Sequence, residues 1–121
     1  MKIFDCTTFY SEHLMMDIRF NVLNEKVDKF IVVESKYSHS GKEKNLNFDI
    51  NNYKKFKDKI IYILLDKEPE NLLPVLNDGD EFLGNKRINT LKRIKLQYNA
   101  LSDGITNADI NDLIIVSDID E

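Results

Sequence analysis

Three apolar runs rich in β-branched residues recur along the chain, and an acidic residue follows each of them within two positions. Residues 30–33 lead into Glu34, residues 60–65 into Asp66, and residues 113–116 into Ser117 and Asp118. Continuous apolar runs of this length predict strands buried on both faces, as in parallel sheets covered by helices. Residues 3–7 form a further short run of β-formers. We therefore expect strands at 3–7, 29–35, 60–65 and from residue 113, the last of them buried on both faces.

Two of the intervals between these runs have helical periodicity. A first helix is predicted from Ser11, a candidate N-cap, to about Asn24, with one apolar face on the sheet. That face comprises Leu14, Met15, Ile18, Val22 and Leu23. A second helix is predicted from Arg87 to about Asp103, with Gly104 placed to end it. Its stripe comprises Ile88, Leu91, Ile94, Tyr98, Leu101 and Ile105. Residues 51–59 predict a short basic surface helix, and residues 66–85 a long irregular connection.

The alternation of strands and helices predicts an α/β domain with a mainly parallel sheet. The length of 121 residues is that of one domain, 1–121, with a single core. Ligands of such sheets bind beyond the carboxyl ends of the strands, where the strand order reverses. We expect the first and fourth strands to flank that point.

Composition narrows the classes of partner. The net charge of −4 and the isoelectric point near 5.2 give no reason to expect nucleic acid or an anionic membrane. No apolar run approaches the ~20 residues of a membrane span. Cys6 is the single cysteine, so an internal disulfide is impossible and a zinc cluster is disfavoured. Together with an acidic residue, Asp5, where a signal peptide would be apolar, these features fit a reducing cytoplasm.

The acids after the last run have the pattern of a cation site. On an extended chain, Asp118 and Asp120 point the same way while Ile119 points back into the core. Two carboxylates suit Mg²⁺ or Mn²⁺, which keep other coordination positions for water and phosphate. Such a cation stabilises a diphosphate leaving group. An isolated Asp-x-Asp also occurs in solvated turns without a ligand, but the preceding apolar run favours a site here.

Several stretches, in the same order along the chain, resemble glycosyltransferase family 17, whose best-known activity adds the bisecting N-acetylglucosamine to N-glycans. They are residues 4–9 with Glu12 and 16–20, residues 27–35, residues 37–42, Arg93 with 97–101, and residues 113–121. The resemblance implies a Rossmann-like, GT-A-type nucleotide-sugar domain. It also implies that Asp118 and Asp120 hold Mn²⁺ or Mg²⁺ on the diphosphate of a UDP-sugar, such as UDP-N-acetylglucosamine, for transfer to a glycan acceptor.

The resemblance also implies a set of donor-nucleotide residues. The loop after the first strand holds the base in such folds, and further contacts are expected from a strand end and from the second helix. The residues are Thr7, Thr8, Phe9, Glu34, Arg93 and Asn99.

The chain departs from the family pattern in three places: Ser11 precedes Glu12 where the family has Asn, Tyr98 precedes Asn99 where it has Arg, and there is no Trp. Family members continue past the acidic cluster with the acceptor site and any catalytic base. We therefore expect an incomplete domain that binds a donor without turnover.

Two other functions remain as alternatives. A haloacid-dehalogenase-like phosphotransferase also delivers Asp-x-Asp from an apolar strand, with the first Asp, here Asp118, as nucleophile. That family carries the motif near the start of its domain, followed by Gly and Thr or Val, unlike this chain. The third hypothesis is a non-catalytic, truncated α/β interaction module. Its last strand would present an exposed edge, through which the chain could self-associate.

Overall fold

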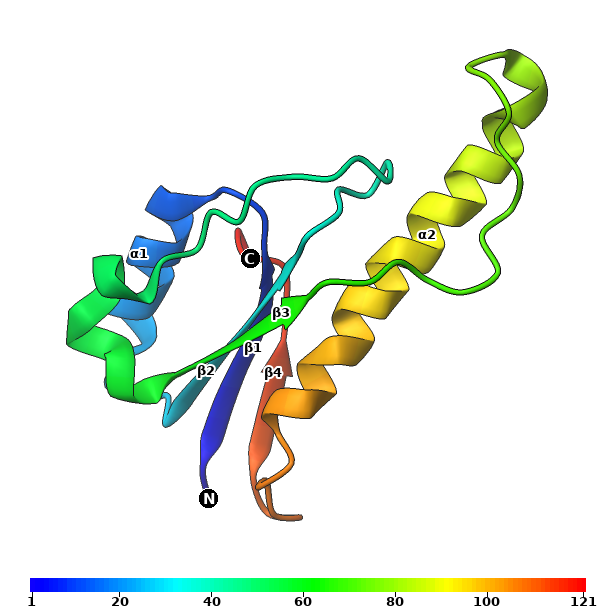
Figure 1. The fold of residues 1–121 in the computed structure, drawn as a ribbon. Coiled ribbons are helices and arrows are strands. Elements are labelled where there is room, and N and C mark those ends of the chain that lie inside the picture. The colour runs from blue at the N-terminus through cyan, green and yellow to red at the C-terminus, as the bar shows by residue number, and fades with distance from the viewer.

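Four parallel strands form one sheet in the order β3-β2-β1-β4 (Figure 1). The strands are β1 (Ile3–Phe9), β2 (Lys29–Ser35), β3 (Ile60–Leu65) and β4 (Leu113–Val116). The computed structural model describes all residues, 1–121. β2 and β3 follow β1 on one side, and β4 lies on its other side. This order confirms the α/β fold and places the reversal of strand order between β1 and β4.

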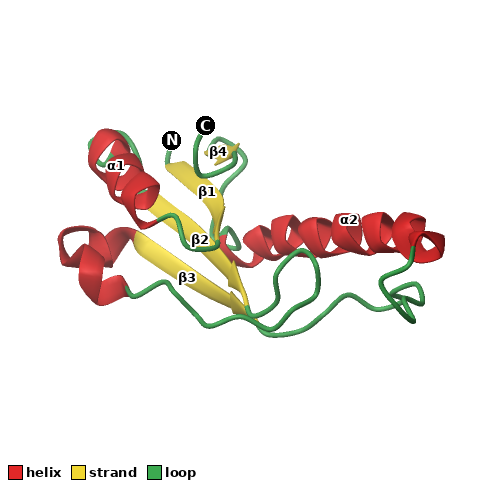
Figure 2. Ribbon diagram, turned by 90° about the horizontal axis from the view of Figure 1, so that it is seen from above, coloured by secondary structure: helices red, strands yellow, loops and turns green.

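Helices cover both faces of the sheet (Figure 2). The α-helices are α1 (His13–Leu23) and α2 (Leu83–Ala100), and the 3₁₀ segments are η1 (Ile50–Lys59), η2 (Asp80–Phe82) and η3 (Leu101–Gly104). One core cluster joins α1 and η1 to the sheet, and a second cluster joins η3 and the end of α2 to the opposite face. None of the helices combines the length and the apolar character that a membrane span requires.

β2 is the central element of both clusters. Phe30 and Val32 belong to the first cluster, Ile31 and Val33 to the second, and all four are at most 1% exposed. Side chains alternate between the faces of a strand, so this apolar run is buried on both faces as predicted. Full burial of each such side chain contributes about 1.5–3 kcal/mol. The second face is packed so closely that a Cβ on Gly104 would lie 2.4 Å from Cγ2 of Ile31.

The apolar face predicted for α1 is only partly confirmed: Met15 and Leu23 pack against the first core cluster, but the other three predicted residues are exposed. The helix buries Met16, Arg19 and Phe20, whereas the predicted core residues Leu14 and Val22 are 72% and 71% exposed. Arg19 pairs with Asp5 of β1, so a charged side chain occupies part of the buried face of the helix. The predicted cap is also wrong: α1 begins after Glu12, whose carboxylate accepts the N–H groups of Tyr10 and Ser11.

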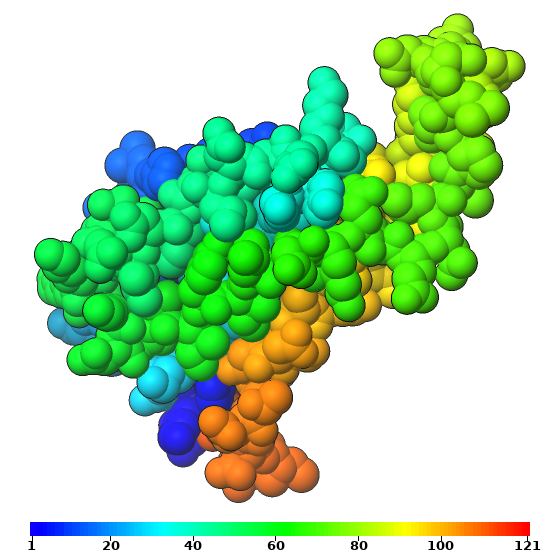
Figure 3. Space-filling model, viewed as in Figure 1, coloured from blue at the N-terminus to red at the C-terminus, as the bar shows by residue number.

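α2 begins at Leu83, four residues before the predicted start, and η3 continues it to Gly104. Leu101 is buried as predicted, but Ile88 and Leu91 are 44% and 64% exposed. Their half of α2 extends beyond the sheet, and the connection that follows β3 runs beside it (Figure 1). In Figure 3 this part of the chain projects from the rest of the molecule. Only the C-terminal end of the predicted apolar stripe therefore lies in the core.

β4 is not buried on both faces, which corrects the prediction. Leu113, Ile115 and Val116 are 44%, 37% and 51% exposed, and Ile114 alone packs against the second cluster. β4 is an edge strand with β1 as its one neighbour. An apolar run does not distinguish an edge strand from a central one, because that difference depends on which strands pair with it.

Candidate functional site at the strand ends

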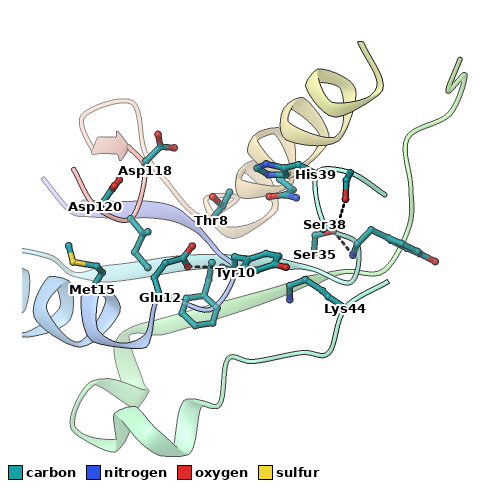
Figure 4. A pocket seen from close by; sticks show the side chains of 15 residues that line it. Thr8, Tyr10, Glu12, Met15, Ser35, Ser38, His39, Lys44, Asp118 and Asp120 are labelled. Carbon is teal, nitrogen blue, oxygen red and sulfur yellow. Dashed lines mark hydrogen bonds between the residues drawn. The ribbon is translucent and has the colours of Figure 1, made fainter. Parts of the chain in front are cut away.

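A cavity of about 660 Å³ opens at the carboxyl ends of β1 and β2, beside the chain that follows β4 (Figure 4). This volume is typical of small-molecule sites. Three segments supply most of its walls: the end of β1 with the start of α1, the loop after β2, and the residues after β4. Its lining residues are Thr8, Phe9, Tyr10, Glu12, Met15, Ser35, Tyr37, Ser38, His39, Ser40, Lys44, Gln97, Asp118, Ile119 and Asp120. We call it the strand-end cavity.

The acidic residues form a turn at the end of the chain rather than an extended segment. Residues 117–121, the acidic turn, are closed by the Glu121 N–H, which donates to the Asp118 carbonyl at 3.2 Å. Asp118 and Asp120 are exposed and line the strand-end cavity, while Ile119 between them is buried in the first core cluster. Ile119 therefore anchors the turn, and the two carboxylates face solvent in the cavity.

Arg19 holds the acidic turn from the side of α1. Its Nε and Nη2 donate to the two Asp5 oxygens at 2.7 Å each, and Nη2 also donates to Ser117 Oγ. Its Nη1 donates to the carbonyls of Asp118 and Ile119 at 2.9 and 3.4 Å. Asp5 is 1% exposed, so a bidentate buried ion pair fixes the backbone of the turn. Such forked pairs add geometric specificity as well as energy.

Tyr98 holds the turn from the side of α2. Its phenol donates a hydrogen bond to Asp118 Oδ1. This bond, with a smaller effect of burial, raises the pKa of Tyr98 to about 12. The phenol therefore stays protonated and acts as a donor to the carboxylate.

The opposite wall is the loop after β2, which is also attached to α2. Residues 37–43 close through a bridge between Tyr37 and Glu43. Arg93 donates to the His39 carbonyl at 3.2 Å and to Glu68 Oε1 at 2.9 Å. Gly41, at φ +89°, leaves room for the guanidinium, since a Cβ there would lie 2.5 Å from Arg93 Nη2. Figure 4 shows Ser38 and His39 across the cavity from Asp118 and Asp120.

The family comparison decides the class of protein. The family model for glycosyltransferase family 17 matches residues 1–121. The chain belongs to glycosyltransferase family 17. No curated protein and no solved structure gave a significant match. For a family 17 chain, a nucleotide-sugar donor and a glycan acceptor are the general partners, and a glycosyltransferase role is favoured over the haloacid-dehalogenase-like alternative.

Four of the residues predicted from the sequence line the strand-end cavity of this family 17 chain, namely Thr8, Phe9, Asp118 and Asp120. Thr7 lies within β1 and is 1% exposed, with its hydroxyl donating to the Thr8 carbonyl. β1 continues to Phe9, so the loop after it starts later than predicted. Arg93 and Asn99 are outside the cavity lining, and Asn99 is exposed on another face of α2.

Glu34 is fully buried and lies outside the cavity lining. Burial alone would raise its pKa. The amides of Asn47 and Phe48, the Lys44 ammonium at 2.8 Å and the Tyr62 hydroxyl at 2.7 Å outweigh burial and hold the pKa below its usual range. Glu34 therefore fixes the chain after the loop, and with it Lys44, on the cavity wall.

Several lining residues were not among the predicted donor contacts, chiefly Tyr10, Glu12, Ser38, Ser40 and Lys44. The stretch 37–42 carried a family-like signal, but composition alone marks it only as a polar loop. Nothing in the sequence marked Lys44 as a site residue. Its position depends on the contact with Glu34, ten residues away in the sequence.

The donor chemistry of the cavity fits a divalent cation bound together with a phosphate ligand. No group of three acidic, histidine or cysteine side chains forms a metal site by itself. Mg²⁺ is commonly held by only one or two carboxylates, with substrate phosphates and water completing the coordination. Asp118 and Asp120, both on the cavity wall, supply that number of carboxylates.

Proposed function

We propose that this family 17 chain binds a UDP-sugar in the strand-end cavity, with Mn²⁺ or Mg²⁺ held by Asp118 and Asp120. One observation carries the proposal. The two carboxylates line a cavity at the reversal of strand order between β1 and β4, which is where open α/β sheets bind nucleotides. The choice of UDP-N-acetylglucosamine as donor is supported by the resemblance to the family's best-known activity.

The remaining walls suit the other parts of a nucleotide-sugar. The Tyr10 ring, which is 50% exposed, supplies aromatic surface at the end of β1, and the Phe9 ring beside it in the sequence is buried in the core. Aromatic rings of this kind stack on nucleobases. Ser38 and Ser40 supply hydroxyls on the opposite wall, 2.9 Å from each other. Hydroxyls donate and accept hydrogen bonds, so they suit ribose, phosphate or sugar oxygens.

The cation, when bound, supplies charge neutralisation at the diphosphate, which makes it a better leaving group. The chain's own residues prepare the site for it. Arg19 fixes the backbone of the acidic turn, and Ile119 keeps the turn on the core. The acceptor is a glycan hydroxyl, whose attack on the donor requires a base to remove its proton.

Calorimetric titration of UDP into the purified chain tests the proposal, with and without Mn²⁺. We expect saturable binding that strengthens with Mn²⁺ and is lost in the Asp118→Ala/Asp120→Ala double variant. Both residues are exposed, so the variant should keep its fold, as circular dichroism would show. An Asp103→Ala/Asp109→Ala variant, which removes two exposed acids outside the cavity lining, is the matched control. Failure of the folded wild-type chain to bind UDP at any Mn²⁺ concentration would overturn the proposal.

A further inference from the structure

Asp118 and Asp120 differ in how they are held. The Asp118 carboxylate has one partner, the Tyr98 phenol on Oδ1, and its Oδ2 accepts no hydrogen bond within the chain. The Asp120 carboxylate has no hydrogen-bond partner in the chain, although it lines the same cavity. One acid is thus oriented before a ligand arrives, and the other is free to rotate.

Tyr98 is itself well fixed. Its ring packs against the second core cluster, which contains Phe4 and Leu101. It lies near the end of α2, and that end of the helix contacts the sheet. The phenol therefore presents its hydroxyl from a rigid support. A carboxylate on an exposed turn would otherwise lose rotamer freedom on binding a cation, which weakens binding.

We propose that Tyr98 is a positioning residue for the cation: it orients the Asp118 carboxylate, occupying Oδ1 and leaving Oδ2 as the coordinating oxygen. This inference rests on the proposed function. Hydrogen-bond partners of metal-binding carboxylates orient the ligand, and their loss typically lowers metal affinity by 10- to 100-fold. The Tyr98 hydroxyl is an uncharged donor, so it orients the carboxylate without competing with the cation by charge.

The same helix also positions the opposite wall of the cavity. Arg93, five residues before Tyr98, donates to the His39 carbonyl. α2 therefore links the loop that carries Ser38 and Ser40 to the carboxylate of Asp118. One helix thus holds two walls of the cavity before a ligand binds, and preorganisation of this kind lowers the cost of binding.

The test is the Mn²⁺ affinity of the UDP-saturated chain, measured from the electron paramagnetic resonance signal of free Mn²⁺. We expect Tyr98→Phe to weaken Mn²⁺ binding by about tenfold or more. The ring and its packing remain in this variant, so circular dichroism should be unchanged. Tyr53→Phe is the matched control, because it removes another phenol hydroxyl, which donates to the His13 carbonyl outside the cavity lining. It should leave Mn²⁺ affinity within twofold of wild type.

The outcomes separate the two proposals. Wild-type Mn²⁺ affinity in Tyr98→Phe, or an equal loss in Tyr98→Phe and Tyr53→Phe, would overturn the role of Tyr98 and leave the donor site standing. A wild-type chain that binds neither UDP nor Mn²⁺ would overturn both. Weakening confined to Tyr98→Phe supports the positioning role, since a general loss of stability would not single out the metal.

Discussion

Replacement of Arg19 by methionine should destabilise the protein severely. Asp5 is 1% exposed, and Arg19 supplies both hydrogen bonds to its carboxylate, at 2.7 Å each. The variant would leave a buried carboxylate without a partner, which typically costs about 3–5 kcal/mol. Domains of this size have a free energy of unfolding of about 5–15 kcal/mol. The loss is therefore a large share of the total stability.

The double variant Asp5→Leu/Arg19→Met separates the ion pair from the rest of the contacts. Exchange of a buried pair for apolar side chains is often neutral, so most of the lost stability should return. What remains lost are the hydrogen bonds from Arg19 to Ser117 and to the carbonyls of Asp118 and Ile119, at about 1 kcal/mol each. Both variants lack these hydrogen bonds, so the double variant should be more stable than Arg19→Met by the cost of the unpaired carboxylate alone, about 3–5 kcal/mol.

Urea unfolding followed by circular dichroism measures these differences, with an unchanged m-value showing that the same surface is exposed in each variant. A loss below about 1 kcal/mol in Arg19→Met would refute the reasoning, since buried pairs of this geometry are costly to break. A double variant no more stable than the single one would also refute it, because the unpaired Asp5 carboxylate could not then be the source of the loss.

Two further predictions concern buried titratable groups. Because the pKa of Glu34 is lowered by its partners, its ionised form stabilises the fold above the ordinary Glu pKa of about 4.3. That stability is lost as the pH falls through the folded-state pKa. Urea unfolding of the wild type at pH values from about 3 to about 7, a range that includes the ordinary Glu pKa, should show this loss of stability. Glu34→Gln should lack it and should be less stable at neutral pH by about 3 kcal/mol. An acid dependence unchanged in Glu34→Gln would contradict the assignment. Cys6 is 0% exposed, and burial, then the charge of Asp5, raises its pKa to about 11. Ellman's reagent should therefore leave the native thiol unmodified at neutral pH and react in urea, and fast native modification would contradict its burial.

The strands could be predicted from the sequence because apolar β-branched runs carry that information locally. The bounds of β2 and β3 agree with the predicted ones. The burial of β4 could not be predicted, since it depends on which strands pair with it. Part of the buried face of α1 was mispredicted for a similar reason. Periodicity counts apolar residues, and it gives no weight to Arg19, which is buried because of Asp5, fourteen residues away.

The site residues likewise include some that the sequence indicated and others that depend on contacts between distant segments. The resemblance to the family indicated Thr8 and Phe9, and the Asp-x-Asp pattern after an apolar run indicated Asp118 and Asp120, because a motif of this kind is a local signal. Residues 38–40 carried only the family-like signal of their stretch, and their place on the opposite wall depends on the hydrogen bond from Arg93 to the His39 carbonyl, which no local pattern indicates. Tyr98 was predicted to lie on an apolar stripe, and its ring does pack on the core. Its hydroxyl meets a carboxylate twenty residues later in the chain, a contact that periodicity does not reveal.

The short edge strand β4 makes ligand binding and folding interdependent. β4 has four residues and one neighbour, and backbone hydrogen bonds from Leu113 to Lys2 and from Ser117 to Cys6 hold its two ends to β1. Detachment of β4 would remove one wall of the cavity while the pairing of β1, β2 and β3 persists. A donor that contacts both Thr8 and Asp118 binds only the attached form, and it favours that form by mass action. Occupancy of the cavity by a donor and attachment of β4 to β1 therefore rise and fall together.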